Sequence, residues 1–162
     1  MKYGLSNVYI ANFLAKLKLK HWKGIFSSDN IPNFKKDENY AIVVNLSRSN
    51  ERGSHFIVLV GCKGQVFLFD SLALPYPSLP QSIQKIMKLF NGISILARAI
   101  QSPHSLYCGV YCIYFILYLS LNKDKLRSQF SPKRFSSSDL MSNDNLCLNL
   151  IVNMIKAKKI KI

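Results

Sequence analysis

The chain has 162 residues, of which 49% are hydrophobic, and its formal net charge at pH 7 is +14. This length predicts a single domain spanning residues 1–162, and the hydrophobic content excludes an intrinsically disordered chain. Four cysteines in a chain of this size do not indicate a disulfide scaffold, and MKYGLSNVYI lacks the apolar stretch of a signal peptide. We therefore expect a protein that is not secreted and resides in a reducing compartment.

The surplus of basic residues is expected to draw the protein towards polyanions, of which nucleic acid is the commonest. A solubilising surface with no dedicated partner is the alternative that charge alone leaves open. Thirteen of the 22 lysine and arginine residues occur in four groups: Lys16, Lys18, Lys20 and Lys23; Lys35 and Lys36; Lys123, Lys125 and Arg127; and Lys156, Lys158, Lys159 and Lys161.

The first half of the chain predicts one helix followed by three strands. Ser6 fits an N-cap, and apolar residues follow it at helical spacing, namely Ile10, Phe13, Leu14 and Leu17. Gly, Ser, Asp, Asn and Pro residues predict a loop over residues 24–32. The predicted strands cover residues 40–46, 55–61 and 65–70.

A two-residue turn at Lys63 and Gly64 would join the last two of these strands as a hairpin. Residues whose numbers sum to 127 would then face each other. His55 and Asp70 would become diagonal neighbours on one face of the sheet, roughly 7–8 Å apart between their backbones.

The second half predicts a proline-rich loop over residues 74–80 and a helix over residues 82–90, which Gly92 can close. A strand over residues 93–100 would lead to Gln101. Residues 106–121 carry no charge, but a membrane span needs about 20 apolar residues, so we expect a helix buried on all sides in a globular core. A last helix is predicted over residues 146–159.

Cys108 lies in the first turn of that apolar helix, where unpaired backbone N–H groups and the helix dipole favour an anion. A thiolate there would be nucleophilic. His55 beside Asp70 would form an oriented general base, and Gln101 could donate with the Cys108 N–H to an oxyanion. A buried structural cysteine, a strand-edge histidine and a turn aspartate are the plainer interpretations of the same residues.

His104, Cys108 and Cys112 are four residues apart, which on a helix would stack three metal ligands on one face. A structural zinc site needs four ligands, and the sequence offers no fourth. We therefore predict no metal and no cofactor required for the chemistry.

The order His, Asp, Gln, Cys and the segments GSHFIVLV, VFLFDSL and QSPHSLYCGVYCIYF resemble the adenovirus protease (adenain) family. They are even more similar to its relatives in adenovirus-like viruses and in self-synthesising transposons of the Polinton/Maverick type. The resemblance spans residues 24–115, although the tryptophan usual after the histidine is Phe56 here. It implies the α+β cysteine-protease fold shared with ubiquitin-like-protein-specific proteases, with a central, mostly antiparallel sheet packed by helices and a buried helix starting at the nucleophile.

The resemblance further implies a cysteine endopeptidase in which Cys108 is the nucleophile, His55 the base, Asp70 the acidic member and Gln101 the oxyanion glutamine. Such enzymes cleave virion precursor proteins, typically after glycine, during virion maturation. DNA is an expected partner, and activation by DNA or a peptide would occur without an adenain-type disulfide, since no cysteine lies between Gln65 and Ser105.

We expect a monomer with no membrane partner, located in the virion and the host-cell interior (nucleus or cytoplasmic viral factory). Two other functions stay open. One is a deubiquitinase or SUMO-type modifier protease of the same fold, and the other is a catalytically inactive, basic DNA-binding virion protein.

Overall fold

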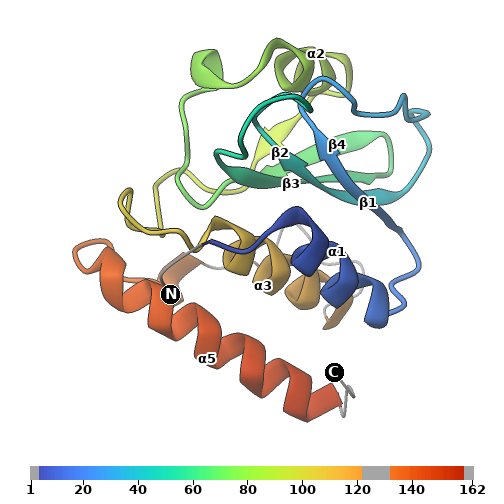
Figure 1. Cartoon of the computed structure of the whole chain (residues 1–162). Helices are drawn as coiled ribbons and strands as arrows, with labels where there is room; N and C mark the ends of the chain where they lie inside the picture. Colours follow the sequence, from blue (N-terminus) through green and yellow to red (C-terminus); the bar gives the residue numbers. More distant parts are fainter. Residues whose placement is uncertain (1–3, 122–131, 159–162) are drawn as a thin grey trace.

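Five strands form one mixed sheet in residues 4–121 and 132–158, the part of the chain that the computed structural model describes (Figure 1). The strands follow one another across the sheet in chain order: β1 (Trp22–Ser27), β2 (Tyr40–Asn45), β3 (Phe56–Cys62), β4 (Gln65–Phe69) and β5 (Ile93–Ser94). The helices are α1 (Asn7–Lys16), α2 (Gln81–Leu89), α3 (Cys108–Leu121) and α5 (Leu140–Lys158), with 3-10 turns η1 (Tyr76–Ser78) and η2 (Pro132–Arg134).

The predicted α+β class is confirmed, and the sheet, which was predicted to be mostly antiparallel, is mixed. β2–β3 and β3–β4 are antiparallel, whereas β1–β2 and β4–β5 are parallel. The two parallel pairs arise because each outer strand is joined to the sheet by a long connection rather than by a tight turn, which is what parallel pairing requires.

Helices cover both faces of the sheet, because the inner strands alternate apolar side chains between their two faces. In β3, Val58 and Val60 belong to the core that contains α1, α3 and α5, whereas Ile57 and Leu59 face the second core. That second core is closed by Ile83 and its neighbours on α2. Figure 1 shows α2 on one side of the sheet and α3, then α5, stacked on the other.

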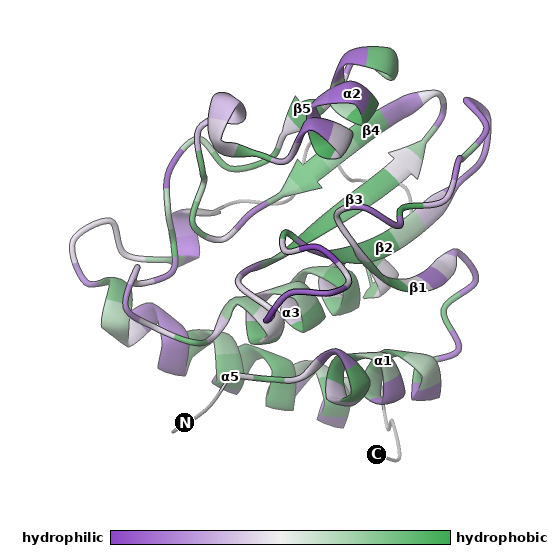
Figure 2. Cartoon of the chain, turned by 45° about the horizontal axis from the view of Figure 1, so that its top comes forward, coloured by the Kyte–Doolittle hydropathy of each residue, from purple (hydrophilic) through white to green (hydrophobic). Residues whose placement is uncertain are grey.

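Helix α3 is the central element of the larger core, as the uncharged run predicts. Every residue from Gly109 to Leu117 is buried, and the ring of Phe115 stacks on Phe69 of β4 with centroids 4.2 Å apart. In Figure 2 this helix is apolar along most of its length, between the sheet and α5. None of the described helices is long and apolar enough to span a membrane.

The β3–β4 hairpin has the predicted register. Val58 pairs with Phe69 and Cys62 with Gln65, so the facing residue numbers sum to 127. Lys63 and Gly64 both have positive φ values, of 50° and 78°, which is the backbone of the two-residue hairpin turn that fits strand twist.

Two predicted elements between residues 22 and 100 are wrong. The loop expected over residues 24–32 begins as strand β1, in which Gly24 (φ 127°) lies at a register shift against β2. The strand expected over residues 93–100 is only Ile93–Ser94, and the remainder is an irregular segment. Its buried side chains, Leu96 and Ile100, are four residues apart, whereas a half-buried strand would bury every second residue.

The last helix begins at Leu140, six residues before the predicted start, and packs against α3. At its N-terminal end Asn143 donates to the carbonyl of Ile100 at 2.9 Å, and Asp144 accepts from the Tyr111 hydroxyl at 3.0 Å. The Tyr111 hydroxyl also bonds to the carbonyl of Ile100, at 3.0 Å, so the segment just before Gln101 is tied to both helices. The basic group of Lys123, Lys125 and Arg127, and two members of the last group, Lys159 and Lys161, lie outside the described residues.

Candidate active site

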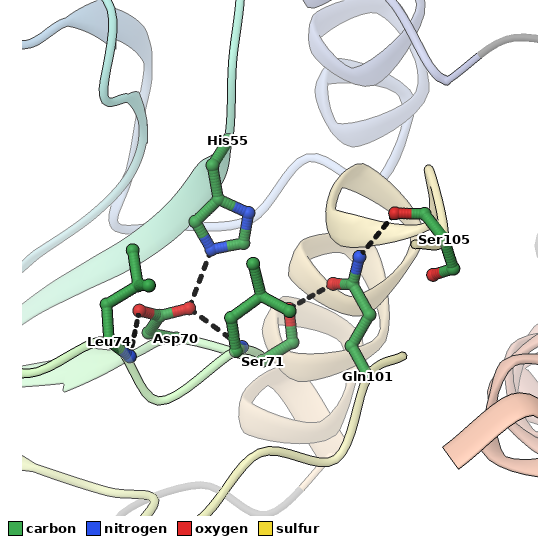
Figure 3. Close-up of polar contacts among 7 residues, drawn as sticks. His55, Asp70, Ser71, Leu74, Gln101 and Ser105 are labelled. Atoms are coloured by element: carbon green, nitrogen blue, oxygen red, sulfur yellow. Dashed lines mark hydrogen bonds and ion pairs between the residues drawn. The ribbon is translucent and has the colours of Figure 1, made fainter. Parts of the chain in front are cut away.

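His55 and Asp70 meet at the end of the sheet where β3 begins and β4 ends. The imidazole Nε2 lies 2.6 Å from the Asp70 carboxylate, and both side chains are buried (Figure 3). The diagonal contact predicted from the hairpin register is therefore confirmed. Asp70 also accepts hydrogen bonds from the backbone N–H groups of Leu72 and Leu74, each at 2.9 Å, which hold the carboxylate in place.

The surroundings favour the charged forms of both side chains. Burial alone would lower the pKa of His55, but its hydrogen bonds to Asp70 and Cys108 and their negative charge together raise that pKa to about 9. Burial opposes ionisation of Asp70, yet hydrogen bonds from His55, Leu74 and Leu72 hold the pKa of its carboxyl below its usual range. The pair therefore exists as imidazolium and carboxylate at neutral pH.

Cys108 is the first residue of α3 and is half-buried, so a reactant can approach its sulfur. Its side chain is close enough to His55 to raise the pKa of the imidazole. Because Asp70 occupies Nε2, Nδ1 is the ring nitrogen left to exchange a proton with the Cys108 sulfur. A side chain at the next residue, Gly109, would approach Ile10 of α1 to 2.7 Å, so glycine lets α1 pack closely against the start of α3.

The Gln101 side chain is buried between the Asp70 loop and the segment that leads into α3 (Figure 3). Its Oε1 accepts from the Ser71 hydroxyl at 2.6 Å, and its Nε2 donates to the carbonyl of Ser105 at 3.0 Å. Ser105 is three residues before Cys108, so the amide lies near the N-terminal end of α3.

The four predicted site residues thus join one network of contacts. His55 bonds to Asp70 and lies close enough to Cys108 for the two groups to influence each other, and Gln101 bonds to the residue that follows Asp70. An imidazolium beside a thiol can hold a thiolate as an ion pair, and that thiolate can attack a carbonyl carbon. The N–H of Cys108 has no partner within its own helix, because it is at the first position.

Sequence reasoning missed the contacts that hold Gln101. Neither Ser71 nor Ser105 was assigned a role in the site. The Ser71–Gln101 bond joins residues that are 30 positions apart, and the Gln101–Ser105 bond joins residues that are four positions apart. Only the shorter contact is local enough for a sequence pattern to indicate it.

The remaining cysteines form no second site. All four thiols are free, and burial raises the pKa of both the Cys112 and Cys147 thiols, which keeps them protonated and unreactive. Cys62 is at the far end of β3. Among residues 4–121 and 132–158, no group of three or more His, Cys, Asp or Glu side chains is placed to hold a metal ion, His104 and Cys112 included.

Comparison with known proteins does not identify the class of this site. No family model matches the chain, and no curated protein matches it.

The buried His55–Asp70 pair predicts a specific pH dependence of stability. The pKa of His55 is raised from 6.5 to about 9 in the folded chain, so its contribution is complete below about pH 6.5 and is lost as the pH rises through about 9. Asp70 has a lowered pKa, so its contribution is present at neutral pH and is lost only in acid. We expect the free energy of unfolding to fall by on the order of 3 kcal/mol between about pH 6 and pH 10.

Urea titrations across this pH range measure the loss. His55→Gln, which cannot titrate there, is the matched control and should show a flatter profile. Parallel profiles for the two proteins would contradict the assigned ion pair.

Proposed function

We propose that this protein is a cysteine endopeptidase of the adenain-like type, which cleaves viral or viral-like precursor proteins after glycine during virion maturation. The observation that carries the proposal is the arrangement of three side chains: Asp70 bonds to His55, and His55 lies close to Cys108 at the start of a buried helix. A half-buried cysteine, a buried histidine and a buried aspartate in this order supply a nucleophile, a base and an orienting group.

In the proposed mechanism His55 already holds the proton given up by the Cys108 thiol, and the thiolate of this ion pair attacks the scissile carbonyl carbon. The resulting oxyanion accepts hydrogen bonds from Gln101 Nε2 and the Cys108 N–H. When the tetrahedral intermediate collapses, His55 protonates the leaving amine and a thioester remains on Cys108. Water, deprotonated by His55, then attacks the thioester, releasing the carboxylate product and restoring the thiol.

The experiment that tests this function is labelling with a peptide aldehyde or vinyl electrophile that ends in glycine, with and without duplex DNA. Rapid labelling confined to Cys108 and faster with DNA supports the DNA-assisted protease. Rapid labelling with no DNA effect favours a protease that removes a ubiquitin-like modifier. Slow labelling of all four cysteines alike would instead favour an inactive, basic DNA-binding protein.

Exposed lysines support DNA as the partner, because they gather at one end of the sheet. β1 and β2 are parallel and β3 runs antiparallel to them, so the starts of β1 and β2 lie beside the β3–β4 turn. Lys36 lies next to Gly64 in that turn, and Lys23 forms an ion pair with Glu38 at 3.0 Å. We call this set the basic end of the sheet, namely Lys20, Lys23, Lys35, Lys36 and Lys63.

His55 and Asp70 lie at the opposite end of β3 and β4. A strand of seven residues is about 20 Å long, so DNA on the basic end would leave the candidate active site open to a protein substrate. This arrangement fits tethering of the enzyme to DNA while it cleaves neighbouring proteins.

Charge reversal should separate DNA binding from catalysis. We expect Lys36→Glu with Lys63→Glu to weaken duplex binding and to reduce the slope of log affinity against log salt by about two, because the protein would neutralise two fewer phosphates. Fluorescence anisotropy over a salt series measures both quantities. Turnover of a short peptide without DNA should not change.

The matched control is Lys85→Glu with Lys88→Glu, which makes the same charge change on exposed positions of α2. Equal loss of DNA binding in the two double variants would mean that only net charge matters, and the basic end would not be the DNA surface.

A further inference from the structure

The two residues immediately after β4 bond to two different residues of the candidate site. Asp70 bonds to His55, whereas the next residue, Ser71, bonds to Gln101 (Figure 3). The backbone of Ser71 also contributes, since its carbonyl accepts from the N–H groups of Ile100 at 2.9 Å and Gln101 at 3.1 Å. One short turn therefore contacts both the base and the candidate oxyanion donor.

Hydrogen-bond chemistry determines the orientation of the Gln101 amide. A glutamine side chain has two N–H donors and one carbonyl oxygen. The Ser105 carbonyl can only accept, so the side facing it at 3.0 Å must be Nε2. Oε1 then faces Ser71, whose hydroxyl donates to it at 2.6 Å, and the second N–H of Nε2 is left for another acceptor.

We propose that Ser71 is a positioning residue, which holds the Gln101 amide with its free N–H directed to the oxyanion of the tetrahedral intermediate. This inference rests on the proposed protease function. Both side chains are 1% exposed, so a Gln101 carbonyl that lost Ser71 would have no water to bond in its place. The amide would then leave this orientation for others, some of which direct Oε1 towards the oxyanion and repel it.

The mechanism gives Ser71 a distinctive kinetic signature. The thiolate–imidazolium pair depends on Asp70, His55 and Cys108, and it does not need Gln101. Alkylation of Cys108 by iodoacetamide displaces iodide and forms no oxyanion, whereas amide hydrolysis does. Loss of Ser71 should therefore slow hydrolysis and leave alkylation unchanged.

The test compares Ser71→Ala with wild type on a fluorogenic peptide amide that has glycine before the scissile bond. We expect kcat to fall roughly 10- to 100-fold with KM little changed, less than the roughly 10²- to 10³-fold loss for Gln101→Ala. The alkylation rate of Cys108 should equal that of wild type. The combined variant with Gln101→Ala should be no slower than Gln101→Ala alone, because Ser71 acts through Gln101.

Two further variants and one control complete the design. Ser71→Thr keeps the hydroxyl and should retain most of kcat. Ser71→Cys keeps the side-chain size but has only a weak donor, so its kcat should fall. This second comparison remains informative if Ser71→Ala does not fold. Ser82→Ala is the matched control, since the buried Ser82 Oγ has no hydrogen-bond partner among the described residues, and it should behave as wild type.

Wild-type kcat in folded Ser71→Ala or in Ser71→Cys would overturn the inference while the protease function stands. Equal slowing of alkylation and hydrolysis would also overturn it, because Ser71 would then act through the His55–Asp70 pair. A wild-type protein that neither hydrolyses the peptide nor is labelled at Cys108 would instead refute the proposed function itself.

Discussion

Cys108→Ala is expected to lower peptide hydrolysis by at least about 10⁴-fold, because it removes the group that forms the acyl intermediate. The substitution deletes one sulfur atom at the half-buried first position of α3, and the apolar residues that hold this helix in the core, from Gly109 to Leu117, stay unchanged. The melting temperature should therefore stay close to that of wild type. Turnover of a glycine-containing peptide and a thermal melt measure the two results.

Cys62→Ala is the matched control for this prediction. Its thiol is also free and only partly buried, but it lies at the opposite end of β3 from His55. Activity should stay at the wild-type level in this variant. Turnover retained in purified Cys108→Ala would contradict the covalent mechanism.

His55→Ala is expected to lower hydrolysis nearly as much, roughly 10³- to 10⁴-fold or more, because the same imidazolium stabilises the Cys108 thiolate and then protonates the leaving amine. It also leaves the buried Asp70 carboxylate without its charged partner, so some loss of stability should accompany the loss of activity. Iodoacetamide alkylation of Cys108 near neutral pH should be slower as well, since the imidazolium no longer favours the thiolate.

His21→Ala is the control, since His21 is exposed and precedes β1 at the other end of the sheet. It should hydrolyse and alkylate as wild type does. Slow hydrolysis with normal alkylation in His55→Ala would mean that the thiolate does not depend on this histidine, and the base would have to be sought elsewhere.

Most of the site prediction came from sequence patterns among residues that are close together in the chain. A two-residue turn with positive φ at both positions determines the β3–β4 register, and that register alone brings His55 next to Asp70. The uncharged run after residue 105 predicted a buried helix, and Cys108 is its first residue. These features depend on residues close in the chain, so periodicity and turn chemistry could reveal them.

The parts that were missed depend on partners far away in the chain. β1 is a strand because it pairs with β2 across a connection of twelve residues, and a glycine at its register shift made it resemble a loop. Residues 96–100 form no strand. The Ile100 backbone bonds to Ser71 and Asn143, and the Arg98 side chain donates to the carbonyls of Phe135 and Ser136.

Patterns among neighbouring residues were enough to predict the buried helix with Cys108 at its start, the hairpin that pairs His55 with Asp70, and the α+β class. Tertiary structure alone decided the parallel outer strands, the gathering of separate lysines at one end of the sheet, and the partners of Gln101. The two groups of features differ in how far apart in the sequence the interacting residues lie. Backbone periodicity and turn geometry are encoded by neighbouring residues, whereas the Ser71–Gln101 hydrogen bond exists only after packing has brought two distant loops together.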